Sequence, residues 1–164
     1  MGLAPAAHGA NRTGRVFTGD RSGDFLFAAL HRAGLASQPE AVGRDDGMVL
    51  EDVFITAPVK CAPPANKPTP GERCACQPFF QRELRALTGV KVILVLGGIG
   101  YAATAAELGL RPRPRFGHGL EVALPDGRKL LCSYHVSQQN TFTGRLTEPM
   151  FDTVLVRAME LARA

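Results

Sequence analysis

The sequence predicts an α/β fold built on a parallel sheet that helices cover on both faces. Patterns typical of strands and of helices alternate along the 164 residues, as a parallel sheet requires. The clearest strand is the unbroken apolar run Val90–Gly97, which a helical pattern rich in small residues follows directly. A second buried strand, Lys129–Tyr134, precedes the C-terminal helix. We expect residues 1–164 to form a single domain with a substantial core.

Further helices are expected on either side of these strands. The segment Asp24–Leu35 places its apolar residues on one face. Thr69 and Glu72 have the spacing of a capping box, so a helix should begin there, although Pro78 should disturb its first turns. Thr147 is the expected N-cap of the last helix.

Two more β segments complete the expected sheet. Residues Met48–Val59 are rich in β-forming side chains and lead into a proline-rich loop. Pro125-Asp126-Gly127 is a strong turn signal and predicts a strand pair around it.

The composition permits a nucleic-acid partner and argues against a membrane protein. The net charge is +4, the pI is about 9.1 and the mean hydropathy is −0.01. A modest basic excess is compatible with DNA binding without requiring it. The sequence has no apolar run long enough to span a bilayer and no signal-peptide pattern, so we expect a cytoplasmic location and no membrane contact.

Three polar loops of the kind that follow strands are the most informative part of the chain, although the strand expected before the first of them is missing. They cover residues 2–20, 60–70 and 135–144. The carboxyl ends of parallel strands share one edge of a sheet, so we expect the loops to meet there. Together they offer an aromatic ring, a carboxylate, an amide and an imidazole, from Phe17, Asp20, Asn66 and His135. This set suits extraction of a flat heterocycle and hydrolysis of the bond that holds it.

Some of these residues also have a purely structural interpretation. Asp20 has the position of a residue that caps a helix, and Asn66 is of a type that favours turns. A separate motif, Gly98-Ile99-Gly100-Tyr101-Ala102-Ala103, fits a dinucleotide fingerprint. Close packing of a small-residue helix on its strand explains that motif equally well, and no acidic strand end follows about twenty residues later.

Three long motifs carry a resemblance that extends over nearly the whole chain. They are GLAPAAHGANRTGR-x-FTGD, KCAPPANKPTP followed by Cys76, and SYHVSQQNTFTGRLT, in that order. In these motifs the chain resembles the family 5 uracil-DNA glycosylases. The resemblance implies a three-layer α/β/α sandwich around a central four-stranded parallel sheet. It also implies a monofunctional DNA-repair hydrolase that excises uracil, and further deaminated bases such as hypoxanthine or xanthine, from DNA.

The resemblance implies roles for the residues of the three loops. Phe17 resembles the aromatic that stacks on the flipped base, and Asp20 resembles the acidic residue linked to catalysis. His135 resembles the catalytic histidine, and Asn66 the loop asparagine near the base. Asn140 belongs to the loop that enters the duplex as the base leaves.

Further residues are expected to contact the base or the DNA. Gly2, Ala4 and Ala6 are expected beside the base, with Ala6 and Ala7 where other uracil glycosylases carry a polar side chain that activates water. Arg12, Arg15 and Arg145 are suited to phosphates, and Gln139 and Phe142 to the gap that the base leaves. We expect a monomer that acts on double-stranded DNA, with single-stranded DNA as a second candidate.

The family binds a [4Fe–4S] cluster through four cysteines, and Cys61 and Cys76 match the second pair. The chain starts after the first pair, and Cys74 is an extra thiol too close to Cys76 to replace it. The first strand of the family's sheet is also missing apart from its last residues. We therefore expect an N-terminal truncation with Met1 as a misplaced start. The alternatives are a DNA-binding remnant without activity and a dinucleotide-binding oxidoreductase.

Overall fold

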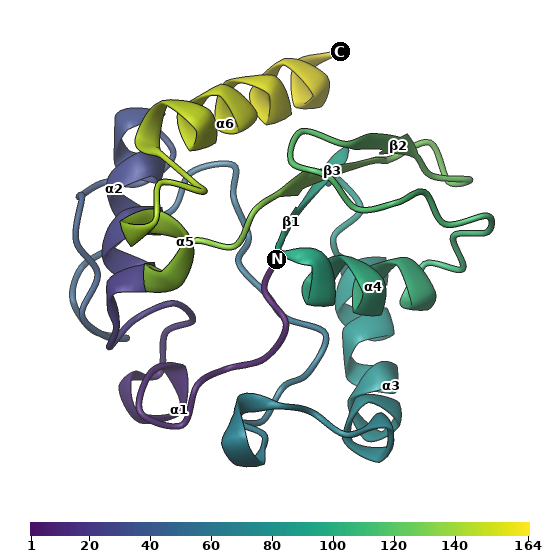
Figure 1. Ribbon diagram of the computed structural model, residues 1–164, viewed down its shortest axis with the longest axis horizontal. Helices are drawn as coiled ribbons and strands as arrows, with labels where there is room; N and C mark the ends of the chain where they lie inside the picture. Colours follow the sequence, from purple (N-terminus) through teal and green to yellow (C-terminus); the bar gives the residue numbers. More distant parts are fainter.

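The computed structural model describes residues 1–164, apart from the side chain of Asn66, and confirms the α/β class (Figure 1). The strands are β1 (Val92–Leu96), β2 (Glu121–Ala123) and β3 (Lys129–Ser133). The helices are α1 (Ala10–Thr13), α2 (Arg21–Arg32), α3 (Pro70–Ala86), α4 (Gly98–Glu107), α5 (Gln138–Phe142) and α6 (Glu148–Arg163), with a 3-10 turn η1 (Pro64–Asn66).

Helices lie on both sides of the sheet, as the sequence predicts. Helices α2 and α6 lie on one side, and α3 and α4 lie on the other (Figure 1). Along β1, Leu96 packs into the core with α2 and α6, whereas Ile93 and Val95 pack into the core with α4 and β3. Burial on both faces explains why the strand is an unbroken apolar run. Cys132 is fully buried in the second core, which raises the pKa of its thiol to about 12.

The sheet itself differs from the expected four parallel strands. The described strands form a mixed sheet in the order β1-β3-β2, with β1 parallel and β2 antiparallel to β3. The predicted strand Met48–Val59 does not form a regular strand: it bends at residues 51–52, and its β-bridge is an isolated one from Leu50 to Ala36. The expected hairpin around Pro125-Asp126-Gly127 is present between β2 and β3.

The N-terminal residues account for this difference. Residues 1–3 lie between β1 and residues 56–59 and hydrogen-bond to both. The Gly2 N–H donates to the Thr56 carbonyl at 3.0 Å, and the Leu96 N–H donates to the Met1 carbonyl at 3.0 Å. The Met1 amino group donates to the carbonyl of Leu94. Residues 1–3 thus contact both segments, and no regular ladder is present over Met48–Val59 in the described part of the chain.

An apolar cavity of about 440 Å³ lies beside Met1, between β1 and residues 52–56. The C-terminal half of α6 also lines it, through Ala158 and Met159. The α-amino group of Met1 is buried, which lowers its pKa to about 5. The N-terminus is therefore a neutral amine at pH 7, held among apolar groups.

The helix ends agree in most details with the sequence patterns. Thr69 and Glu72 form the predicted capping box, and α3 continues through Pro78 to Ala86. Thr147 occupies the N-cap of α6 but makes no side-chain capping bond. Among the described helices, none combines the length and apolar composition that a membrane span needs.

Close packing explains the glycines of the fingerprint-like motif. A Cβ on Gly98 would lie 3.3 Å from the Phe116 ring, and one on Gly100 would lie 3.4 Å from a methyl group of Val95 and 3.5 Å from the Gly2 carbonyl. The motif therefore fits a helix packed against its strand and its neighbours, without a bound dinucleotide.

Candidate active site

The ends of β1 and β3 and the first loop bring Phe17 and His135 together. The two ring centroids are 6.2 Å apart, and the planes are tilted by 39°. A Cβ on Gly97, the residue after β1, would lie 3.1 Å from the Cβ of His135. A Cβ on Gly2 would lie 3.0 Å from Cζ of Phe17. Glycines at both positions thus let the backbone approach the two rings closely.

Phe17 is held in an unusual backbone conformation. Its φ is +60°, in the left-handed region that side chains other than glycine rarely adopt. Gly23, in the first turn of α2, makes this possible, because a Cβ there would lie 1.8 Å from the Phe17 carbonyl oxygen. Strained residues of this kind persist only where the surroundings hold them, and they gather at functional sites.

Asp20 caps α2 and also acts on His135. Its Oδ1 accepts hydrogen bonds from the N–H groups of Ser22 at 2.9 Å and Gly23 at 3.3 Å. Its negative charge also raises the pKa of His135. The capping role that the sequence suggests is therefore real, and it leaves an exposed carboxylate near the imidazole.

His135 is a neutral imidazole at pH 7. Burial lowers the pKa of His135 below its usual value, Asp20 opposes this change, and the N-terminal amino group adds to it. A neutral imidazole carries one N–H donor and one acceptor. This environment therefore favours His135 as a hydrogen-bond donor rather than as a cation.

The loop after β3 is more ordered than the sequence suggests. Residues 138–142 form the short helix α5 within the expected loop. The side-chain amide of Asn140 donates to the His135 carbonyl at 2.8 Å, and the Leu146 N–H donates to the Asn140 carbonyl at 3.0 Å. Asn140 thus fixes the loop on His135. Gln139 and Phe142 are exposed, and Phe142 lies under the guanidinium of Arg21 at 5.5 Å.

The comparisons with known proteins agree with this geometry. The uracil DNA glycosylase superfamily model matches residues 1–158. The chain belongs to this superfamily. It is 55% identical over 163 residues to a type-5 uracil-DNA glycosylase of Thermus thermophilus, of which it covers 74%. It is 46% identical over 158 residues to a type-5 enzyme of Pyrobaculum aerophilum, of which it covers 69%. The predicted membership of the type-5 group is confirmed.

The share of each relative that the chain covers varies. The chain is 53% identical over 165 residues to the type-5 uracil-DNA glycosylase of Mycobacterium bovis and spans 62% of its length. In each of these alignments 96% or more of the present chain is matched. The described fold and site therefore lie within the part shared with the type-5 relatives.

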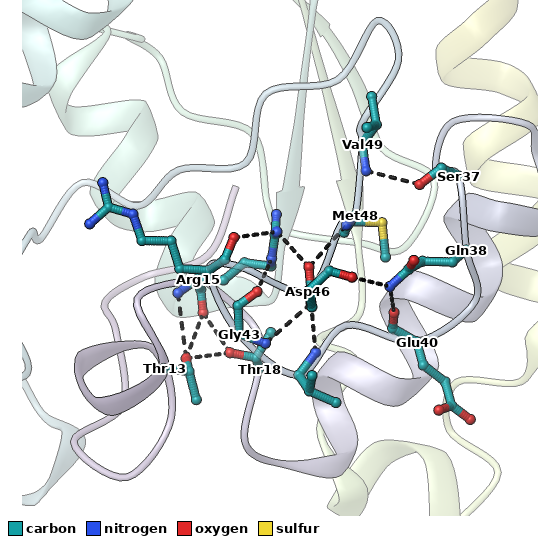
Figure 2. A network of polar contacts seen from close by, with 12 residues as sticks. Thr13, Arg15, Thr18, Ser37, Gln38, Glu40, Gly43, Asp46, Met48 and Val49 are labelled. Carbon is teal, nitrogen blue, oxygen red and sulfur yellow. Dashed lines mark hydrogen bonds and ion pairs between the residues drawn. The ribbon is translucent and has the colours of Figure 1, made fainter.

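Within this type-5 chain, Arg15 has a role that sequence reasoning missed. Its guanidinium forms an ion pair with Asp46 at 2.7 Å and donates to the carbonyls of Gly43 at 2.9 Å and Arg44 at 3.1 Å (Figure 2). Nε and Nη2 of Arg15 thus have partners within the chain, and the expected phosphate contact of Arg15 stays a prediction. Arg12 is exposed, with its Nε bonded to the His8 carbonyl at 3.2 Å.

Asp46 is the centre of this network. Burial alone would raise its pKa, but hydrogen bonds from the N–H groups of Met48, Gly43 and Val42 and the charge of Arg15 lower the pKa to about 2. Figure 2 shows how these groups converge on the carboxylate. The Asp46-Gly47 turn signal in the sequence could have suggested a structured loop, though not its partner.

The remaining predicted site residues in the loops lie in different surroundings. Ala4 and Ala6 are half-buried, and the Ala6 carbonyl accepts from the Gly9 N–H at 3.1 Å. The expected role of Asn66 concerns a side chain that lies outside the described part of the chain. Arg145 is exposed, and its guanidinium lies 4.8 Å from the centre of the Tyr134 ring.

The cysteines offer too few ligands for the expected cluster. Cys61 and Cys74 are exposed, and Cys76 is half-buried with its Sγ accepting from the Lys60 N–H at 3.4 Å. In the described part of the chain, no three potential metal ligands gather at one place. A [4Fe–4S] cluster needs four thiolates, so these residues do not fit it.

Proposed function

We propose that this chain is a monofunctional DNA glycosylase that flips uracil out of duplex DNA and hydrolyses its N-glycosidic bond. The observation that carries the proposal is the convergence of Phe17, Asp20 and His135 at one edge of the sheet. The relatives named type-5 uracil-DNA glycosylases support it. Hypoxanthine and xanthine are further candidate substrates, because both are flat deaminated bases.

Asp20 and His135 stabilise the two opposite charges that develop during cleavage. Cleavage builds positive charge on the sugar and negative charge on the departing base. The exposed carboxylate of Asp20 stabilises the sugar cation and orients the attacking water, as carboxylates do in glycoside hydrolysis. His135, a neutral donor, hydrogen-bonds to the base as it becomes an anion. The Phe17 ring stacks on the base and holds it beside His135.

The exposed residues around the site suit a DNA duplex. Flipping a base costs a few kcal/mol of stacking and pairing, which other contacts must offset. Gln139 and Phe142 on α5 are exposed and can fill the gap. Arg12 and Arg145 are exposed and can contact phosphates. The same proposal includes Asn66, Gly2, Ala4 and Ala6 beside the base, on the strength of the resemblance.

Several finer points belong to the proposal. Asn140 acts through its bond to the His135 carbonyl and lies beside the base pocket. We propose a monomer in the cytoplasm, with single-stranded DNA as a second substrate form. No step involves an iron–sulfur cluster, because Cys61 and Cys76 supply only half of the thiolates that a cluster needs.

The test is single-turnover excision with enzyme in excess over a duplex that carries one U·G pair. The product is an abasic site, which alkali converts into a strand break. Asp20→Asn is the sharpest variant, because asparagine caps a helix as well as aspartate does and only the charge is lost. We expect its rate to fall by about 100-fold or more. Asp24→Asn, an exposed change in the first turn of the same helix, is the matched control and should leave the rate unchanged.

Absence of excision by the unmodified chain, even at equimolar enzyme and long times, would refute the proposal. Duplex binding without excision would instead support the DNA-binding remnant. Equal rates for Asp20→Asn and Asp24→Asn would remove Asp20 from the mechanism.

A further inference from the structure

His118 contacts the chain directly before His135. Its Nδ1 accepts a hydrogen bond from the Tyr134 N–H at 3.1 Å and lies 3.4 Å from Oγ of Ser133. Strand β3 ends at Ser133, so the Tyr134 N–H has no partner in the ladder. A half-buried N–H at a strand end must bond elsewhere, and His118 supplies the acceptor.

The same histidine packs on the Tyr134 side chain. The His118 and Tyr134 rings are stacked, with centroids 5.0 Å apart and planes inclined by 26°. The Arg145 guanidinium lies 4.8 Å from the Tyr134 ring centre, and the Phe116 ring lies 6.2 Å from it. Side chains from two separate segments, residues 116–118 and Arg145, thus hold Tyr134 in place.

These contacts restrict the backbone that carries His135. His118 holds the N–H of Tyr134, and Asn140 holds the carbonyl of His135 at 2.8 Å. The dipeptide Tyr134-His135 is therefore bonded at both ends. Fixing these two backbone groups limits the rotation of the chain between them, and with it the direction in which the His135 side chain leaves the backbone.

The acceptor role requires a particular form of His118. Nδ1 must be unprotonated to accept from an N–H group, so the proton of the neutral ring lies on Nε2. Burial lowers the pKa of His118, and a hydrogen bond to the Met150 backbone opposes this effect. The neutral form is the one that holds Tyr134 at pH 7.

We propose that His118 is a positioning residue that sets the orientation of His135 through the backbone and ring of Tyr134. This inference rests on the proposed function for its effect on excision, but not for its effect on His135 itself. It assigns to residues 116–118, which precede β2, a part in the site at the end of β3. A displacement of about 1 Å at a reacting group can reduce a rate by about 100-fold, so such support matters.

Two substitutions distinguish the contribution of the His118 Nδ1 acceptor from that of its stacked ring. His118→Phe keeps a ring to stack on Tyr134 but loses Nδ1, whereas His118→Asn keeps an acceptor at the position of Nδ1. We expect His118→Phe to slow single-turnover excision between about 10-fold and 100-fold, with duplex Kd changed by less than about 3-fold. We expect His118→Asn to retain a rate within about 3-fold of the unmodified chain. His31→Asn, at an exposed position, is the matched control.

A second measurement tests the role of His118 without relying on excision activity. The pKa of His135, followed by nitrogen-15 NMR of the imidazole, should move toward the ordinary value of about 6.5 in His118→Phe and stay in place in His118→Asn. In the unmodified chain the Tyr134 amide should be protected from hydrogen exchange. This measurement needs no variant, so it is informative even if a variant does not fold.

The inference fails if the Tyr134 amide exchanges freely, or if both His118 variants leave the His135 pKa and the excision rate unchanged. Equal losses in both variants would mean that His118 serves the fold alone. If the unmodified chain excises nothing, the proposed function fails, while the NMR and exchange data still decide the role of His118.

Discussion

At the scale of single residues, the carboxylate of Asp46 accepts hydrogen bonds from the Arg15 guanidinium and from three backbone N–H groups (Figure 2). Its carboxylate joins Arg15, in the loop that carries Phe17, to the backbone of residues 42–48. Asp46→Asn would remove a charge that three N–H groups and one guanidinium stabilise. We expect it to lower the free energy of unfolding by about 2–3 kcal/mol, measured by urea denaturation at pH 7.

The exposed neighbour Asp45 provides the control. Asp45→Asn should change the free energy of unfolding by less than about 0.5 kcal/mol. The pKa of Asp46 lies at about 2, below its ordinary value of 3.8. The unfolded chain therefore binds the proton first as the pH falls, and the stabilisation from Asp46 is lost between about pH 4 and pH 2. A similar acid transition in Asp46→Asn would contradict this assignment.

A second residue-scale prediction concerns Gly23, whose missing Cβ leaves room for the Phe17 carbonyl. Gly23→Ala would place a methyl group 1.8 Å from that oxygen, so the backbone of Phe17 would have to move. We expect thermal unfolding to show a loss of more than about 2 kcal/mol, together with reduced excision. A Cβ on Gly71, in the first turn of α3, would make only an ordinary contact, with Thr69 Oγ1 at 4.0 Å, so Gly71→Ala should stabilise the chain by up to about 1 kcal/mol.

The residue scale also shows what the sequence could and could not predict. The placement of Phe17 beside His135 was predictable, because the first loop and the loop after Lys129–Tyr134 were expected to meet at one edge of the sheet. The ion pair of Arg15 with Asp46 was not, because the two residues are separated by 31 positions and nothing local marks them as partners. The contact of His118 with Tyr134 was not predictable for the same reason, because the two residues are 16 positions apart.

At the scale of elements, the two threonines at helix N-termini make a matched pair. Thr69 accepts from the Glu72 N–H at 3.2 Å in a complete capping box, whereas Thr147 makes no side-chain capping bond. We expect Thr69→Ala to lower the free energy of unfolding by about 1 kcal/mol and Thr147→Ala by about 0.5 kcal/mol or less. Chemical denaturation of both variants at one pH tests this, and equal losses would contradict it.

Helices were predicted better than strands for a physical reason. Capping residues and the spacing of apolar residues act locally, so α3 and α6 begin where their threonines suggest. A strand needs a neighbour, which local sequence does not supply. Met48–Val59 has β-forming residues, yet it pairs with only a few residues at the N-terminus and one bridge. A β-forming composition alone therefore does not produce a ladder.

At the scale of the whole molecule, the buried N-terminus links stability to pH. The pKa of the Met1 amino group is about 5 in the folded chain, against 8.0 for an exposed amine. The unfolded chain binds this proton more tightly, so the amino group lowers the free energy of unfolding progressively as the pH decreases from 8 to 5. At pH 7 this loss is on the order of 1 kcal/mol.

Acetylation of the Met1 nitrogen isolates this effect. An acetylated amine cannot be protonated, retains an N–H that can donate to the Leu94 carbonyl, and places its methyl group toward the apolar cavity of about 440 Å³. We expect the acetylated chain to have a higher Tm at pH 7 and a flatter dependence of Tm on pH between 8 and 5. Calorimetry of both forms, with Met1 verified by mass spectrometry, measures the difference. His118 and His135, whose pKa values are also lowered, titrate in both forms, so parallel curves would show that the amino group is not the cause.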